Sequence, residues 1–126
     1  MFRILIADDH DIVREGLKDL LLEEFPLAFI GEANDTVSLI DLAISHSWDI
    51  VVSDIKMPGG GAFVALEKIK PQKPSLPIIL ISSNPAEQYA DRAVKAGAEQ
   101  FISKDSLSTE LLKALQDILE QKTRKM

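Results

Sequence analysis

Short apolar runs alternate with amphipathic segments along the whole chain. Runs rich in Ile, Leu, Val, Phe and Ala are typical of strands that are buried on both faces of a parallel sheet. The pattern predicts five such strands, at residues 2–7, 28–33, 50–52, 78–81 and 99–103.

Each predicted strand is followed by a segment in which apolar residues recur at helical spacing. The inward faces are predicted to carry Val13, Leu17, Leu20 and Leu21 in the first helix; Val37, Ile40 and Ile44 in the second; Ala62, Phe63, Leu66 and Ile69 in the third; Ala86, Ala90, Ala93 and Val94 in the fourth; and Leu107, Leu111, Leu115 and Ile118 in the last. Residues suited to helix ends flank these segments: Asp35 or Thr36, Pro85 and Ser106 at starts, Pro26 and Gly97 at ends.

Five strands that alternate with five helices favour right-handed parallel crossovers. The predicted fold is therefore α/β, a three-layer α/β/α doubly wound domain around a five-stranded parallel sheet. In such a sheet all strands end at one edge, so residues that follow different strands are brought together there.

Composition narrows the function classes. The chain has 126 residues and no cysteine, which suits one domain without disulfides or a cysteine zinc site, in a reducing cytoplasm. No apolar run approaches the roughly 20 residues that span a bilayer, so no membrane association is expected. The net charge of -6 argues against direct binding of nucleic acid. The basic residues near the end indicate a frayed helix or a linker, so the domain is predicted to cover 1–121, with 122–126 outside it.

The run from Ile50 to Val52 leads directly to Asp54, and Met57, Pro58 and three glycines follow. The strand must stop close to that carboxylate, at the sheet edge where open α/β folds bind ligands. Asp54 is therefore the candidate reactive residue.

Four other polar residues follow strands and should lie near Asp54: Asp8, Asp9, Ser82 and Lys104. Singly, each is more often a helix cap or a surface residue than a functional group. Three carboxylates at one place repel one another, however, and a hard cation such as Mg²⁺ offsets their charge.

These motifs resemble the receiver domain of two-component response regulators. The resemblance rests on the acidic pair after the first strand, DIKMPGG at 54–60, the hydroxyl of Ser82, and KAGAEQFIS followed by Lys104, and it covers nearly the whole chain. ILIADDH, GEA and SKDS are most similar to receivers that precede a LuxR/NarL-type helix-turn-helix domain. The resemblance implies a flavodoxin-like fold with strand order 2-1-3-4-5.

The resemblance also assigns roles within the site. It implies that Asp54 accepts a phosphoryl group from a sensor histidine kinase, which docks over the first turns of the helix after Asp9. It implies that Asp9, Asp54 and the backbone carbonyl of Lys56 hold Mg²⁺, and that Asp8 acts largely through a water molecule.

The remaining roles concern the phosphoryl group and the response. Lys104 and the Ser82 hydroxyl would contact phosphoryl oxygens, and Ser82 and Phe101 would move as a coupled pair when the domain switches. Such a domain catalyses only its own phosphorylation and dephosphorylation. Its output would be transcription regulation through a DNA-binding domain outside this chain, and a homodimer on phosphorylation is compatible with this scheme.

Other interpretations stay open from the residues alone. A stand-alone receiver that acts by protein contacts fits the same motifs. A Mg²⁺-dependent phosphatase would use Asp54 as nucleophile but needs a second acid two residues later, where this chain has Lys56. A flavodoxin-like cofactor binder is disfavoured because the acidic edge would repel a flavin phosphate.

Three positions depart from the family pattern. Ser82 stands where the family often has Thr. Asp105 stands where many receivers have a cis proline, which leaves the bond between Lys104 and Asp105 open between cis and trans. The three glycines at 59–61 predict a loop that is mobile without an ion or phosphoryl group.

Overall fold

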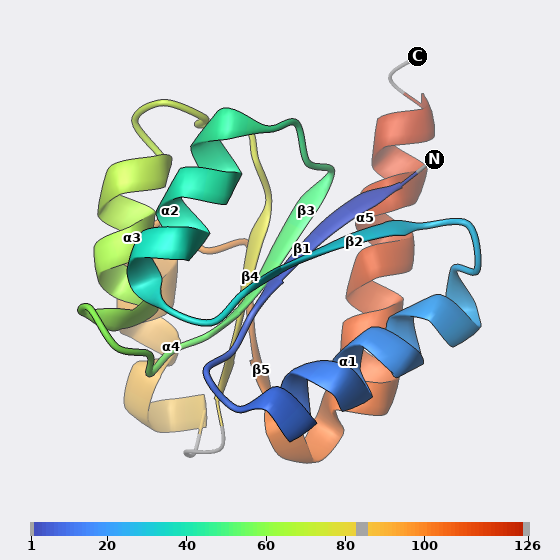
Figure 1. Cartoon of the computed structure of the whole chain (residues 1–126), viewed down its shortest axis with the longest axis horizontal. Coiled ribbons are helices and arrows are strands. Elements are labelled where there is room, and N and C mark those ends of the chain that lie inside the picture. Colours follow the sequence, from blue (N-terminus) through green and yellow to red (C-terminus); the bar gives the residue numbers. More distant parts are fainter. Residues whose placement is uncertain (1, 83–85, 125–126) are drawn as a thin grey trace.

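The computed structural model describes residues 2–82 and 86–124. They form one five-stranded parallel sheet with helices on both faces (Figure 1). The elements are β1 Arg3–Ala7, α1 Asp11–Glu24, β2 Phe29–Ala33, α2 Thr36–Ser45, β3 Ile50–Asp54, α3 Gly61–Ile69, β4 Ile78–Ser82, α4 Ala86–Lys95, β5 Gln100–Ser103 and α5 Leu112–Arg124. A 3₁₀ turn at Lys104–Ser106 and a π-helical turn at Leu107–Leu111 lead into α5.

The strand order is β2-β1-β3-β4-β5, as the resemblance implies. The registers bring the strand ends level with one another: Ala7 pairs with Ser53, Asp54 with Ile81, and Ser82 with Ser103. Residues after β1, β3, β4 and β5 therefore meet at one edge of the sheet.

The side chains of the strands alternate between two apolar layers. On one face Leu5, Val51 and Leu80 pack with α2, α3 and α4. On the other face Ile4, Ile6, Val52, Ile79 and Ile81 pack with α1 and α5. Figure 1 shows this division, with α1 and α5 on one side of the sheet and α2, α3 and α4 on the other. In the described part of the chain, no helix is long and apolar enough to cross a membrane.

The prediction of core-facing positions is wrong for two residues. Val37 is 63% exposed and Val94 is 72% exposed. The buried face of α2 is formed instead by Thr36, Leu39 and Ala43, and in α4 the neighbouring Ala93 is buried. Adjacent helical residues point about 100° apart, so the prediction at each valine was out of phase by one position. Two further predictions, the helix start at Pro85 and the inward side chains of residues 86 and 90, lie outside the described part of the structure.

The helix ends follow local hydrogen bonding. Asp35, rather than Thr36, caps α2, because its carboxylate accepts the Ser38 N–H at 2.8 Å, which lowers the pKa of Asp35. Gly97 has φ +97° and closes α4 as predicted. Ser106 precedes the π-helical turn, but its side chain makes no capping bond, so the capping prediction for Ser106 is wrong.

Candidate functional site

Two carboxylates are held inside the protein at the carboxyl edge of the sheet. Asp54 is the last residue of β3 and is 6% exposed, and Asp8, which directly follows β1, is fully buried. Asp9 is the next residue and is more exposed, with 30% of its side chain accessible. The structure thus brings together the three acids that the sequence predicts.

Lys104 reaches this group from the turn after β5. Its Nζ lies 3.3 Å from Oδ2 of Asp8 and 3.4 Å from Oδ2 of Asp54. The side chain of Lys104 is only 19% exposed, so water screens these pairs less than it screens surface ion pairs.

Burial raises the pKa of the Asp54 carboxyl above its ordinary value. The Lys104 ammonium opposes this effect, and the negative charge of Asp8 reinforces it. The ionised form of this carboxyl is therefore less stable in the folded protein than in water. Binding a cation, or reacting with an electrophile, would stabilise it.

A cleft of about 390 Å³ opens over Asp54. Its lining contains the predicted residues Asp9, Lys56, Ser82 and Lys104. Ser82 is 3% exposed and lies at the end of β4, and the side chain of Lys56 is exposed. A group bound in this cleft lies among two acids, two lysines and one hydroxyl.

Phe101 lies in β5, two residue pairs before the Ser82–Ser103 pair at the cleft. It pairs with Leu80, whereas Ser82 pairs with Ser103. Because side chains alternate along a strand, Ser82 and Phe101 face the same side of the sheet, and Phe101 is partly buried against the layer that contains α4. This placement is compatible with a coupled pair, and their coupled motion stays a prediction.

The loop that carries Lys56 is fixed by backbone geometry and by Thr36. All three glycines at 59–61 have positive φ, and a Cβ on Gly61 would lie 2.5 Å from the Ile55 carbonyl oxygen. Thr36 is buried; its hydroxyl accepts the Gly61 N–H at 2.8 Å, and its own N–H donates to the Pro58 carbonyl at 3.0 Å. The motif DIKMPGGG therefore needs its glycines, and loop mobility without an ion stays a prediction.

The described residues contain no cis peptide bond, so the bond between Lys104 and Asp105 is trans. The hydroxyl of Ser103 accepts the Asp105 N–H at 3.3 Å.

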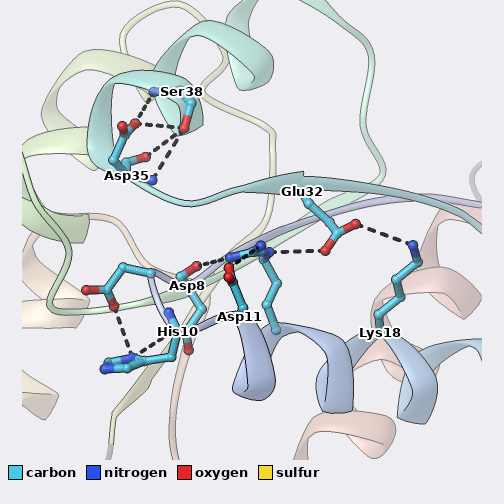
Figure 2. Close-up of polar contacts among 9 residues, drawn as sticks. Asp8, His10, Asp11, Lys18, Glu32, Asp35 and Ser38 are labelled. Atoms are coloured by element: carbon cyan, nitrogen blue, oxygen red, sulfur yellow. Dashed lines mark hydrogen bonds and ion pairs between the residues drawn. The ribbon is translucent and has the colours of Figure 1, made fainter.

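Sequence reasoning missed two residues beside the acids, His10 and Arg14. Figure 2 shows the imidazole of His10 beside Asp8. The Nδ1 of His10 lies 3.1 Å from Oδ1 of both Asp8 and Asp9. The guanidinium of Arg14 donates to the backbone carbonyl of Asp8 at 2.8 Å and to Glu32 of β2 at 3.1 Å. Because His10 directly follows two acids, its place beside them could have been predicted from the sequence. The contacts of Arg14 depend on tertiary structure and could not.

The donor set fits a divalent cation. One ligand atom from each of Asp8, Asp9, His10 and Asp54 lies within 4.8 Å of the others. Three of these donors are carboxylate oxygens, which Mg²⁺ prefers. The backbone carbonyl of Lys56 comes from the loop that borders the same cleft.

Comparisons with known proteins give a consistent result. The family model described as "Response regulator receiver domain" matches residues 4–116. The nitrate/nitrite response regulator protein NarL of Escherichia coli K12 is 34% identical over 112 residues, which are 89% of this chain and 52% of NarL. The chain thus spans about half the length of the curated relatives it matches.

Solved structures agree with the sequence comparisons. A LuxR-family two-component response regulator from Aurantimonas sp. SI85-9A1 has a TM-score of 0.85 at 33% identity, covering 94% of this chain and 85% of that one. The response regulator TrrA from Thermotoga maritima, solved with Mg²⁺ and BeF, has a TM-score of 0.84 at 28% identity, covering 94% of this chain and 99% of that one.

Proposed function

Because this chain belongs to the response regulator receiver domain family, we propose that Asp54 accepts a phosphoryl group from a sensor histidine kinase in a Mg²⁺-dependent reaction. The observation that carries the proposal is the position of Asp54, at a strand end, beneath a cleft and close to Asp8 and Lys104. The solved relative TrrA, which contains Mg²⁺ and BeF, supports the choice of cation.

The transfer is a displacement at phosphorus. A carboxylate oxygen of Asp54 forms the new P–O bond, the P–N bond of a phosphohistidine breaks, and the electron pair stays on the imidazole nitrogen, which takes up a proton. Lys104 stabilises the negative oxygens of the transferring group, and the Ser82 hydroxyl donates to one of them.

Asp9 and Asp54, with the Lys56 carbonyl, would hold Mg²⁺, and Asp8 would act largely through a water molecule. The bound ion supplies positive charge that neutralises the phosphoryl oxygens. The buried Asp8 also holds the Lys104 ammonium at the edge of the cleft through their 3.3 Å contact.

A kinase reaches Asp54 over the first turn of α1. Ile12 is 85% exposed there, two residues before Arg14 and three after Asp9. An exposed apolar side chain beside the cleft suits a protein partner that delivers the phosphohistidine.

The proposed output is transcription regulation through a DNA-binding domain outside this chain. Support comes from the similarity to NarL and to a LuxR-family regulator. Phosphorylation would draw Ser82 toward the phosphoryl group and let Phe101 turn inward, which reshapes the α4, β5 and α5 face and permits a homodimer. A stand-alone receiver that acts by protein contacts is the alternative output.

The reaction is tested with acetyl phosphate and Mg²⁺, followed by intact-mass spectrometry. The native chain should gain one phosphoryl group that hydroxylamine removes, as it does from acyl phosphates. Asp54→Ala should gain none, whereas Asp41→Ala, which changes an exposed aspartate of α2, should react like the native chain. An adduct that persists in Asp54→Ala would refute the assignment.

A further inference from the structure

The imidazole of His10 is turned toward the carboxylates, and its Nδ1 lies within hydrogen-bonding distance of Asp8. His10 precedes the first turn of α1, but its side chain makes no capping bond. Its Nδ1 lies 3.1 Å from Oδ1 of Asp8 and 3.1 Å from Oδ1 of Asp9. The side chain is 65% exposed, so a hydrated ion can reach the ring from solvent.

These distances match the spacing of neighbouring ligands on one metal ion. Two ligand atoms at roughly 2.1 Å from an ion lie roughly 3.0 Å apart at right angles and roughly 3.4 Å apart in a tetrahedron. The observed 3.1 Å separations lie within that range. The imidazole therefore lies at ligand spacing from one oxygen of each carboxylate.

Lys104 and His10 approach different oxygen atoms of the buried Asp8 carboxylate. Lys104 approaches Oδ2 of Asp8 and Oδ2 of Asp54, whereas His10 approaches Oδ1 of Asp8. The ammonium and a cation held by His10 thus contact different oxygens of the same buried carboxylate, which limits their mutual repulsion.

We propose that His10 selects the metal at this site: its Nδ1 ligates borderline divalent ions such as Co²⁺, Ni²⁺ and Zn²⁺ together with Asp8 and Asp9. Imidazole suits these ions, whereas Mg²⁺ takes oxygen ligands and keeps several waters. His10 therefore favours the borderline ions over Mg²⁺. The inference rests on the proposed metal site and adds a residue to which no role was assigned.

The test compares Co²⁺ and Mg²⁺ binding by titration calorimetry in the native chain, His10→Ala and His46→Ala. His46 is the other histidine of the chain and is exposed at the end of α2, so it is the matched control. Loss of a ligand should weaken Co²⁺ binding by at least about tenfold in His10→Ala. Mg²⁺ affinity should stay within about twofold, because Mg²⁺ is held by oxygen ligands and does not use the imidazole. His46→Ala should match the native chain for both ions.

A spectroscopic readout identifies the ligand directly. The native chain with Co²⁺ should show paramagnetically shifted imidazole proton resonances, which are absent from His10→Ala and retained in His46→Ala. His10→Gln, checked by circular dichroism with His10→Ala, serves as a second variant and should also lose these resonances.

Two results would overturn the inference. Unchanged Co²⁺ affinity in His10→Ala means that the ring is no ligand, and equal losses of Co²⁺ and Mg²⁺ mean that His10 only positions Asp8. Mg²⁺-dependent phosphorylation is measured separately on the native chain. Selective loss of Co²⁺ binding in His10→Ala supports the inference even if that phosphorylation fails, in which case only the proposed function is wrong.

Discussion

Replacing Gly61 by alanine should destabilise the protein and distort the loop that borders the cleft. Gly61 has φ +81°, a region that costs a residue with a Cβ about 1–2 kcal/mol. The new Cβ would also lie 2.5 Å from the Ile55 carbonyl oxygen, which accepts the Ala62 N–H at 2.9 Å. Displacing that oxygen costs about 0.5–1.5 kcal/mol more if the hydrogen bond is lost. The free energy of unfolding should therefore fall by about 1.5–3.5 kcal/mol.

Gly16→Ala is the matched control. Gly16 lies inside α1 and is exposed, and a Cβ added to it would meet no atom within 4 Å. Alanine there should stabilise the protein by about 0.5–1 kcal/mol. The two Gly→Ala changes are thus expected to have opposite signs.

Urea unfolding followed by the fluorescence of Trp48, the single and buried tryptophan, measures both variants. Because the loop also carries the Lys56 carbonyl, Gly61→Ala should weaken Mg²⁺ binding, whereas Gly16→Ala should not. If Gly61→Ala were as stable as the native chain, the strained loop geometry and its role in placing Lys56 would be wrong.

Three further predictions concern the site and its partners. Burial raises the pKa of Asp54 in the folded protein, so the ionised carboxyl lowers the stability of the fold at neutral pH. Asp54→Asn removes this charge and should raise the free energy of unfolding at pH 7 by about 0.5–2 kcal/mol. Urea titrations should show that gain shrinking as the pH falls toward the ordinary aspartate pKa of about 3.9, and a gain independent of pH would contradict the cause. Ser82→Ala should still be phosphorylated but should lose most of the beryllofluoride-induced change in amide exchange over residues 86–105; an undiminished change would refute the coupling to Phe101. Glu15→Lys should slow transfer from a cognate kinase but not from acetyl phosphate, and equal losses with both donors would mean damage to the site rather than to docking.

Sequence patterns were sufficient to predict the architecture and to predict that the acidic residues lie close together. The apolar runs that end at Asp8, Asp54, Ser82 and Lys104 define strand ends, and parallel strands place their ends at one edge. These two patterns predict that residues distant in the sequence lie together, and the prediction needs no knowledge of side-chain packing.

Helix orientation was less predictable where a segment is apolar on several faces. The α2 sequence TVSLIDLAIS offers more than one apolar stripe, and the structure buries Leu39 and Ala43 rather than Val37. The choice is set by tertiary contacts, because Thr36 must lie against the glycine loop and accept the Gly61 N–H. The exposed Val94 illustrates the same limit in α4, where its neighbour Ala93 is buried.

The polar neighbours of the acids depend on long-range geometry. Arg14 bridges the Asp8 carbonyl and Glu32, which lie on opposite sides of it in the sequence. No local pattern specifies that bridge, since it requires α1 to pack beside the end of β2. The position of His10, by contrast, follows from its neighbours in the chain.

Chemical mapping of the modified residue tests most directly whether Asp54 is the phosphoryl acceptor. The chain is treated with acetyl phosphate, reduced with borohydride, digested and sequenced by tandem mass spectrometry, because borohydride converts an aspartyl phosphate to homoserine. Homoserine should occur at position 54, only when Mg²⁺ is present during phosphorylation. Homoserine at another aspartate, or a phosphoryl group retained on a serine with position 54 unchanged, would contradict the proposed function.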